Sequence, residues 1–402
     1  MRILKADFLY PGNESVIRDG IVVLDQDDRI VDIVDPATRG ADWQVLNGRE
    51  ELETLRGGIC PGFINAHTHL ELSHMLGKLP RHTRLPGFLA AVNAQRAADA
   101  ETIEAAIVAG DRAMREAGVV GAGDIANTDH TLELKRKSPL RYHTFIEAFD
   151  LHPDRAEAEF EKKTALRDRY RAAGLSASVA PHAPYTVSTR LLKRIDREAK
   201  EQGGPLTLHN QETPGEEAMF RSGDGELLDF LRRATPFYHD WKPTGFSSIA
   251  STLVHLPTCN NLLLVHNTLS TEEDVQWASL YSLRLWWCLC PRANRYIEDR
   301  LPDVPMLQRM GVKLTVGTDS LASNDSLSVV DELKVLAQAF PEIGTEELIR
   351  WATWNGAEFF GWHRELGSLA VGTKPGVVHL SGLDPVSGDL TPESESRLIA
   401  SN

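Results

Sequence analysis

Eight short apolar runs between residues 59 and 317 alternate with longer amphipathic stretches. The runs have the length of buried strands, whereas 101–117 and 329–340 repeat apolar residues at intervals of three and four, as a helix with one buried face does. Strands that alternate with helices form parallel sheets, because each helix returns the chain to the edge where the next strand begins. Eight such units predict an α/β fold, a (β/α)8 TIM barrel. The predicted strands are residues 59–67, 119–125, 144–149, 176–181, 206–209, 262–266, 283–290 and 312–317, and the predicted helices include 155–173 and 188–201.

Both ends of the chain are rich in short strands and turns. Residues 21–25 and 29–34 flank a polar turn, as in a hairpin, and a turn-rich segment precedes the apolar residues 377–380. Neither end has enough apolar positions to form a core alone. We therefore expect both ends to pair in one small β-sandwich domain, residues 1–57 and 365–402.

The remaining residues, 58–364, are the predicted barrel. One connection within it, about residues 213–261, is far longer than an ordinary crossover and contains an amphipathic segment at 226–233. An insertion of this kind beside a barrel mouth can serve as a lid or a substrate wall. It can equally be a structural embellishment, and the sequence leaves both interpretations open.

The charge balance of the chain excludes some classes of partner. The formal net charge of the 402 residues is -14, and phosphate backbones and anionic lipids are bound by clustered Lys and Arg. We therefore expect no nucleic-acid partner and no membrane partner. No apolar run approaches the roughly 20 residues of a spanning helix, and an acid, Asp7, precedes any stretch of signal-peptide length.

The cysteines indicate the compartment in which the protein folds. The four cysteines are too few and too irregularly spaced for a disulfide framework, which favours a reducing, cytoplasmic location. Cys288 and Cys290 stand two apart in a strand, and without a matching second pair we expect them to pack rather than to bind metal. Trp286 and Trp287, in the same strand, are expected in the core. The sequence does not fix the oligomeric state, and a homo-oligomer is one of the states that it allows.

Polar residues follow several of the apolar runs directly. His67 and His69 stand two apart in an extended segment, so their rings project from the same side and can hold one ion. His209 ends the fifth predicted strand and Asp319 follows the eighth. Three imidazoles and one carboxylate suit zinc, or alternatively ferrous iron, with a position left for water. The sequence therefore predicts one divalent metal ion per chain, whose effect is to lower the pKa of a bound water.

The number of ions follows from the end of the fourth predicted strand. Barrels that hold two ions usually place a bridging ligand there, often a modified lysine, but residues 179–185 contain neither Lys nor an acid. We therefore expect a mononuclear site. His182, in this segment, is then either a substrate contact or a packed structural histidine, and we favour the substrate contact.

Glu212 and His266 complete the predicted catalytic set. Glu212 stands three residues beyond His209, so the turn leaving the strand can bring its carboxylate over the metal and allow it to relay a proton. A solvated loop acid is the alternative. His266, at the end of the sixth predicted strand, would orient the nucleophile or stabilise negative charge on oxygen. Asp319 would also accept a proton from the nucleophile.

The motifs around these residues resemble those of the amidohydrolase superfamily. Within it the chain is similar to the cytosine deaminase-like branch that acts on adenosine-type nucleosides, and most to aminodeoxyfutalosine deaminases. The resemblance covers nearly all 402 residues. The segments that carry it are PGFINAHTHLELS (61–73), APHAPYTVS (180–188), LTLHNQET (206–213), LLVHNT (263–268), CLCPRANRYI (288–297) and GTDSLASN (317–324).

The resemblance implies an enzyme, a metal-dependent aminohydrolase that releases ammonia from a 6-aminopurine nucleoside. The implied substrate is 6-amino-6-deoxyfutalosine, which belongs to menaquinone biosynthesis and bears a benzoate-like side chain. Glu71 would then meet ribose hydroxyls, unless it is an exposed loop acid. A substrate carboxylate would favour a nearby cation, and Arg292 is best placed among four candidates because it follows the seventh predicted strand. The other three are Arg81, Arg84 and Arg295.

Several related activities would use the same metal ligands. Methylthioadenosine or S-adenosylhomocysteine deaminases, guanine deaminases and triazine chlorohydrolases differ mainly in their pocket walls. A cyclic amide hydrolase would not need an acid directed at a ring nitrogen. A non-catalytic binding protein is a further alternative, but it would not need to keep Glu212 beside a full ligand set.

Overall fold

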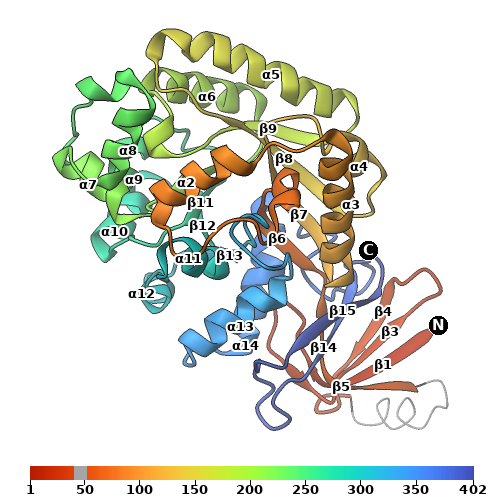
Figure 1. Cartoon of the computed structure of the whole chain (residues 1–402). Coiled ribbons are helices and arrows are strands. Elements are labelled where there is room, and N and C mark those ends of the chain that lie inside the picture. The colour runs from red at the N-terminus through yellow and green to blue at the C-terminus, as the bar shows by residue number, and fades with distance from the viewer. Residues whose placement is uncertain (40–51) are drawn as a thin grey trace.

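The computed structural model describes residues 1–39 and 52–402. Its centre consists of eight parallel strands, which fall on the eight predicted runs, with helices around them (Figure 1). The first four strands form one sheet and the last four form another, each in sequence order. In order they are β6 Phe63–Thr68, β7 Val119–Ala126, β8 Arg141–Ala148, β9 Ser176–Pro181, β10 Leu206–Asn210, β11 Leu262–His266, β12 Leu285–Leu289 and β13 Lys313–Val316.

Hydrogen bonds join the two sheets at the carboxyl ends of their edge strands. The His209 amide, on β10, donates to the carbonyl of His182 just beyond β9 at 2.9 Å. At the other edge, the amides of Thr318 and Asp319 donate to the carbonyl of His67 on β6, at 3.0 and 3.1 Å. This approach requires Gly317, because a Cβ there would lie 2.7 Å from the His67 oxygen. The sheet edges thus bring candidate metal ligands together.

The first predicted strand, 59–67, is wrong in one respect. The run is two strands: β5 Leu52–Pro61 belongs to a different sheet, and β6 begins at Phe63. Gly62 lies between them, where a Cβ would stand 2.3 Å from a methyl group of Val120. Both strands are buried where they meet, so the apolar run continues across the change of sheet and the periodicity cannot reveal it.

The two ends of the chain share one seven-stranded sheet. Its order is β15-β14-β5-β1-β3-β4, with β2 Ile17–Arg18 paired to β1, and both termini lie beside it in Figure 1. The predicted hairpin is present as β3 and β4, which are antiparallel. β14 pairs with β5, so the strand that enters the central sheets is flanked by the carboxy-terminal part of the chain. The remaining bounds are β1 Arg2–Leu9, β3 Ile21–Leu24, β4 Ile30–Val34, β14 Val377–Ser381 and β15 Glu395–Ala400.

The four predicted helices are confirmed as α3 Ala100–Glu116, α5 Ala156–Ala172, α6 Thr189–Gln202 and α13 Val329–Ala339. A side chain at the start of each of three of them accepts a backbone hydrogen bond and so fixes where the helix begins: Asp99, Ser188 and Ser328. The other helices around the sheets are α2 Arg84–Gln95, α4 Leu132–Lys137, α10 Glu272–Tyr281, α11 Pro291–Glu298, α12 Val304–Arg309, α14 Thr345–Arg350 and α15 Gly356–Phe360.

The long connection after β10 forms helices of its own. They are α7 Pro214–Ser222, α8 Glu226–Ala234, the 3-10 turn η4 Pro236–Asp240 and α9 Ser248–Leu253. Ile249 and Leu253 of α9 belong to the main core, but the buried apolar residues of α7, α8 and η4 do not. Instead Leu227 and Tyr238 pack with Leu85 of α2 and Ile297 of α11 in a separate hydrophobic cluster. This inserted segment therefore lies against α2 and α11, which follow β6 and β12.

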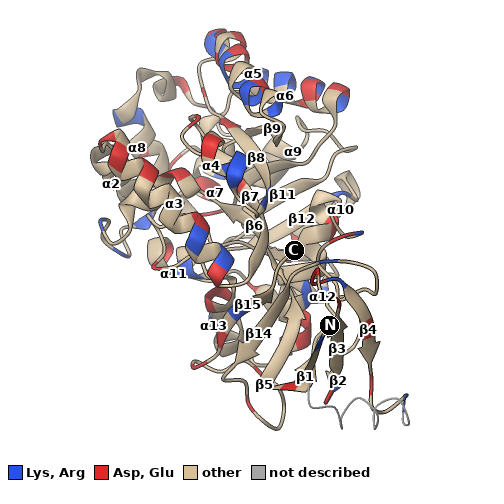
Figure 2. Cartoon of the chain, turned by 90° about the vertical axis from the view of Figure 1, so that its right-hand side faces the viewer, with Lys and Arg blue, Asp and Glu red and all other residues tan. Residues whose placement is uncertain are grey.

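Charged residues lie mostly on the helices, where acidic and basic residues are mixed, while the central strands are largely uncharged (Figure 2). Across residues 1–39 and 52–402, no helix combines the length and the apolar character that crossing a bilayer requires.

His143 on β8 makes the stability of the fold sensitive to acid. Burial, followed by the charge of Lys135, lowers its pKa from 6.5 to about 3, and its ring is bonded to the hydroxyls of Ser176 and Ser178. Below about pH 6.5 the unfolded chain binds a proton that the folded chain does not, so stability falls with pH. We expect wild type to lose ~2 kcal/mol more than His143→Gln in urea unfolding between pH 7 and pH 5. Equal losses would contradict this role.

Candidate metal centre

Four histidines converge where the central strands end. His67 lies on β6, His69 follows it, His209 lies on β10 and His266 ends β11. The ring centres of His67 and His69 are 4.9 Å apart, those of His67 and His209 are 5.0 Å apart, and those of His209 and His266 are 5.5 Å apart. Strands that are distant in sequence thus present one group of imidazoles.

Three of these rings fit a metal ion. The Nε2 atoms of His67 and His69 face each other at 3.1 Å, and ring nitrogens of His67, His69 and His209 all lie within 4.8 Å of one another. Nitrogens bound tetrahedrally at a zinc distance of about 2.0–2.1 Å are roughly 3.3 Å apart. Asp319 Oδ1 lies 3.4 Å from His69 Nε2 and 3.7 Å from His67 Nε2. The geometry therefore fits an ion held by three imidazoles, with a carboxylate beside them.

Neighbouring groups orient these side chains. His209 Nδ1 lies 2.8 Å from the carbonyl oxygen of His182, so this nitrogen donates and Nε2 is left for a ligand. The hydroxyl of Ser323 donates to Asp319 Oδ2 at 2.6 Å, which leaves Oδ1 toward the histidines. Partners of this kind fix the ring tautomer and the carboxylate rotamer of a metal ligand.

The electrostatics of the group also suit a cation. Burial lowers the pKa of His67 to about 4. Burial, and after it the electrostatic effect of His182, lowers the pKa of His209 well below 6.5. Both rings are therefore neutral. Burial acts to raise the pKa of Asp319, but its interactions with His67 and His69 outweigh burial and leave that pKa below its usual value. Neutral imidazoles and an ionised carboxylate are the protonation states that bind metal.

Glu212 lies at the same end of the strands. Its Oε1 is 3.6 Å from His266 Nε2, and burial raises its pKa. The buried carboxylate of Glu216 holds the turn that carries it, since it accepts from the amides of Gln211 and Glu212 at 3.0 and 2.9 Å. A buried carboxyl with a raised pKa is suited to taking up and releasing a proton.

The loops that carry these groups have unusual backbone geometry. Gln211, His266, Asn267 and Asp319 all adopt positive φ, from 47° to 74°, although none is glycine. Such conformations are costly and occur where the surrounding structure imposes them, often at functional sites. Three of the four strand ends that carry candidate groups are thus held in a strained form.

Lys135 and Asp124 form a fully buried ion pair at 2.5 Å. Asp124 also accepts a hydrogen bond from the Leu70 amide at 2.7 Å. Because Leu70 directly follows His69, the ion pair fixes the turn that leaves the candidate metal ligands. Lys135 in addition donates to Thr144 at 2.9 Å, so its charge is well satisfied.

Two of the candidate substrate contacts, His182 and Glu71, differ in their surroundings. His182 lies beside the histidines, with its ring centre 4.8 Å from that of His209. Glu71 is buried, and its carboxylate accepts from the amides of Asn127 and Thr128 at 3.1 to 3.2 Å, which ties it to the loop after β7. It is therefore not an exposed loop acid.

Three of the four candidate arginines already have acidic partners. Arg292 pairs with Asp325 and Asp331, each at 3.2 Å. Arg81 pairs with Asp325 at 2.5 Å, and Arg84 pairs with Glu226 at 2.9 Å. A substrate carboxylate would have to compete with these acids for either Arg81 or Arg292.

Glu147 was not predicted from the sequence. It lies on β8, and its Oε1 is 3.8 Å from His209 Nδ1 and 3.9 Å from His182 Nε2, with no hydrogen-bond partner among the described residues. Asn127 donates to its other oxygen at 2.9 Å. A charged residue inside the apolar run 144–149 was the available signal, because an acid in a buried strand needs a partner.

The cysteines and tryptophans in and next to β12 pack in the core, as predicted from the sequence. Cys288 and Cys290 are buried and form no disulfide, and Trp286 and Trp287 are buried with them in the main core.

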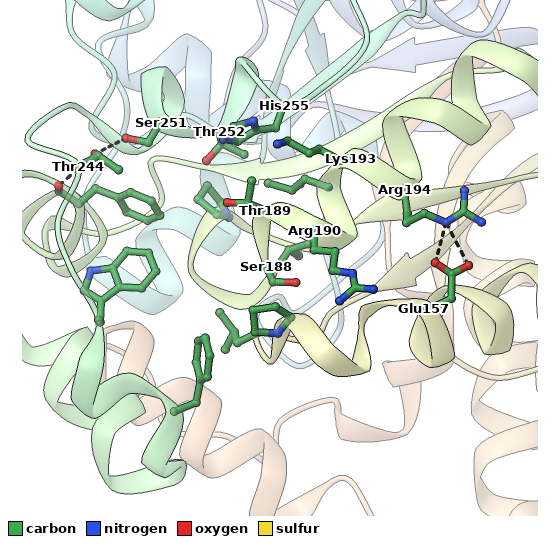
Figure 3. Close-up of a pocket in the computed structure, with 18 of the residues that line it drawn as sticks. Glu157, Ser188, Thr189, Arg190, Lys193, Arg194, Thr244, Ser251, Thr252 and His255 are labelled. Atoms are coloured by element: carbon green, nitrogen blue, oxygen red, sulfur yellow. Dashed lines mark hydrogen bonds and ion pairs between the residues drawn. The ribbon is translucent and has the colours of Figure 1, made fainter.

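A separate groove of about 760 Å³ lies between α6 and the inserted segment (Figure 3). Arg190 and Lys193 line it from α6, and Thr252 and His255 line it from the segment that begins at α9. None of the residues around this groove belongs to the histidine group. It is therefore distinct from the candidate metal centre.

A comparison with family models decides the family of the chain. Residues 59–395 match the amidohydrolase family, which covers every candidate ligand. The chain belongs to the amidohydrolase family. This membership agrees with the group of histidines at the ends of the strands.

Individual relatives of this amidohydrolase span most of its length. It is 29% identical over 380 residues to an aminodeoxyfutalosine deaminase of Deinococcus radiodurans, with 90% of the chain and 86% of the relative covered. A crystal structure of Helicobacter pylori aminofutalosine deaminase with methylthio-coformycin has a TM-score of 0.77 at 24% identity, covering 97% and 94% of the two chains. An adenosine deaminase from Xanthomonas campestris with bound zinc has a TM-score of 0.66 at 22% identity, covering 94% and 83%. The two structures establish a shared fold.

Proposed function

We propose that this amidohydrolase is a metal-dependent deaminase of a 6-aminopurine nucleoside derivative, specifically 6-amino-6-deoxyfutalosine. The observation that carries the proposal is Glu212, buried 3.6 Å from His266, whose ring stacks on that of His209, one of the three imidazoles that fit an ion. The similarity to an aminodeoxyfutalosine deaminase over 90% of the chain supports this substrate.

We propose that His67, His69, His209 and Asp319 hold one divalent ion, and that the ion is zinc. Zinc suits a site of imidazoles and one carboxylate, and the adenosine deaminase of similar fold has bound zinc. A bound divalent ion lowers the pKa of a coordinated water and so supplies a nucleophile near neutral pH. Ferrous iron is the alternative metal.

In the proposed reaction Glu212 moves the protons. Its carboxylate takes a proton from the attacking water, delivers it to a purine ring nitrogen and then assists the departure of the amino group as ammonia. His266 stands beside it to stabilise the developing negative charge on oxygen, and its Nδ1 is 3.3 Å from Asn294 Oδ1, which orients the ring. Asp319 accepts the second proton of the nucleophile, and this proton ends on the departing amino group, so that the two protons of the water are divided between the ring nitrogen and ammonia. The product carries a carbonyl where the substrate carried the amine.

We propose that three residues near the metal ligands contact the substrate. His182 faces the site and would contact the substrate. Glu71 would meet the ribose from its place on the loop after β7, and Arg292 would meet a substrate carboxylate in competition with its present acids.

We also propose that the eight strands close into a (β/α)8 barrel of residues 58–364, with an insertion at about 213–261. The hydrogen bonds at both sheet edges support closure. Residues 1–57 and 365–402 would form the accompanying β-sandwich domain, and their shared sheet supports the pairing of the two ends.

The proposed function is tested by offering the purified enzyme four nucleosides: adenosine, methylthioadenosine, S-adenosylhomocysteine and aminodeoxyfutalosine. The change from adenine to hypoxanthine absorbance and the release of ammonia are followed, with ring opening of a cyclic amide in parallel. We expect aminodeoxyfutalosine to give the highest kcat/KM. A higher kcat/KM for methylthioadenosine or S-adenosylhomocysteine would show that the proposed substrate is wrong. Ring opening of the cyclic amide without ammonia release from any nucleoside would show that the enzyme is not a deaminase.

A further inference from the structure

Tyr185 lies against the proposed proton carrier. It is part of the 3-10 turn η3 Pro184–Thr186 that follows β9, and its hydroxyl donates to Glu212 Oε2 at 3.3 Å. The other oxygen of Glu212, Oε1, faces His266 at 3.6 Å. The two oxygens of the carboxylate are thus divided between a tyrosine on one side and the catalytic histidine on the other.

The hydroxyl of Tyr185 keeps its proton and can therefore donate a hydrogen bond to Glu212. Burial, followed by the charge of Glu212, raises the pKa of Tyr185 well above 10, so its hydroxyl stays protonated. The side chain is 1% exposed, which keeps water from competing for the bond. A hydrogen bond from a neutral hydroxyl to a carboxylate is stronger than one between two neutral groups.

The inserted segment holds Tyr185 in place. The ring packs in the hydrophobic cluster that includes Leu227 of α8 and Leu85 of α2. The hydroxyl of Tyr238, from η4 of the inserted segment, donates to the backbone carbonyl of Tyr185, and Tyr238 is fully buried. A continuous path therefore runs from the insertion through Tyr238 and Tyr185 to Glu212.

We propose that Tyr185 is a positioning residue that fixes the rotation of the Glu212 carboxylate, and that the inserted segment sets this position through Tyr238. The inference rests on the proposed role of Glu212 as the proton carrier. A carboxylate has a broad, roughly two-fold preference about its last torsion, so without a partner either oxygen can turn away from the reacting water. The bond to Oε2 leaves Oε1 directed at the reaction, and the insertion becomes part of the catalytic apparatus.

The kinetic test compares three tyrosine-to-phenylalanine variants that each lose one buried hydroxyl. Tyr185→Phe is expected to lower kcat roughly 10- to 100-fold with KM changed less than about twofold, since the lost bond is to a charged group that carries the proton. Tyr238→Phe is expected to lower kcat less, in the same direction. Tyr10→Phe, which loses a bond to the carbonyl of Gly388 in the terminal sheet, is the control and is expected to leave kcat unchanged. Metal content is measured in all three.

The position of Glu212 gives a second readout that needs no substrate. Crystal structures of metal-loaded wild type and Tyr185→Phe are compared, and we expect the Glu212 carboxylate to be rotated or in two orientations only in the variant. An unchanged carboxylate, or a loss of activity that follows loss of metal or a rise in KM, would overturn the proposal. If wild type deaminates none of the nucleosides, the proposed function fails, while the crystal comparison still decides the role of Tyr185.

Discussion

Replacing Glu212 with Gln is expected to lower kcat about a thousandfold while the metal stays bound. The amide cannot accept and release a proton, and general acid–base catalysis contributes about 10²–10⁴-fold. Glu212 is not among the residues that fit the ion, so elemental analysis should give the same metal content as wild type. Steady-state kinetics on the preferred nucleoside measure the effect, and an unchanged KM would place the loss in the chemical step.

Asp229→Asn is the matched control for this variant. Asp229 lies on α8 of the inserted segment with 59% of its side chain exposed, and the substitution removes the same charge. We expect its kcat to stay within about twofold of wild type, as for a surface change. Near-normal turnover by Glu212→Gln would remove Glu212 from the mechanism, and a thousandfold loss in Asp229→Asn would point to a general effect of charge.

Replacing His69 with Ala is expected to remove metal and stability together. The ring is nearly buried, and its Nε2 faces that of His67 at 3.1 Å and Asp319 at 3.4 Å. An ion that binds only the folded chain stabilises it by about 4 kcal/mol when present at a thousand times its Kd. Without His69 we expect little metal by elemental analysis and an unfolding free energy that a chelator no longer lowers.

His82→Ala provides the comparison, because His82 comes from the same part of the chain and is 53% exposed. This variant should retain the wild-type metal content, and a chelator should destabilise it as it does wild type. A His69→Ala protein with full metal content would show that the ion is held elsewhere.

The sequence predicted the strand positions because each central strand is buried and therefore reads as a short apolar run. It failed between residues 59 and 67, where two buried strands of different sheets follow one another across Gly62. An apolar run records burial, and it carries no information on which sheet accepts the hydrogen bonds of the strand. The paired ends of the chain were predictable for a complementary reason, since neither end could bury a core alone.

Residues at strand ends were the predictable part of the site. These residues lie within three positions of the carboxyl end of a strand, so a parallel arrangement brings them to one edge: His67, His209, His266 and Asp319. Residues that position another side chain could not be predicted from the sequence in the same way. Tyr185 follows a strand within a short turn, and only its contact with Glu212 distinguishes it from a packed aromatic residue.

The sequence also did not predict the ion pairs and hydrogen bonds of the charged residues near the site. Arg292 was expected to be available to a substrate, but it pairs with Asp325 and Asp331 from the region after β13. Glu71 is predicted to meet a ribose, and the sequence did not indicate that its carboxylate also holds the loop after β7. Such partners depend on where loops distant in sequence meet, which periodicity and motif spacing do not specify.

In the proposed metal centre, three histidines and one aspartate hold a single divalent ion. Anomalous scattering from crystals of the purified protein, collected on both sides of the zinc absorption edge, measures this directly. We expect one peak per chain, about 2.0–2.1 Å from ring nitrogens of His67, His69 and His209 and beside Asp319. A protein that turns over nucleosides with no peak there, or with a second peak between Glu147 and His182, would contradict the account.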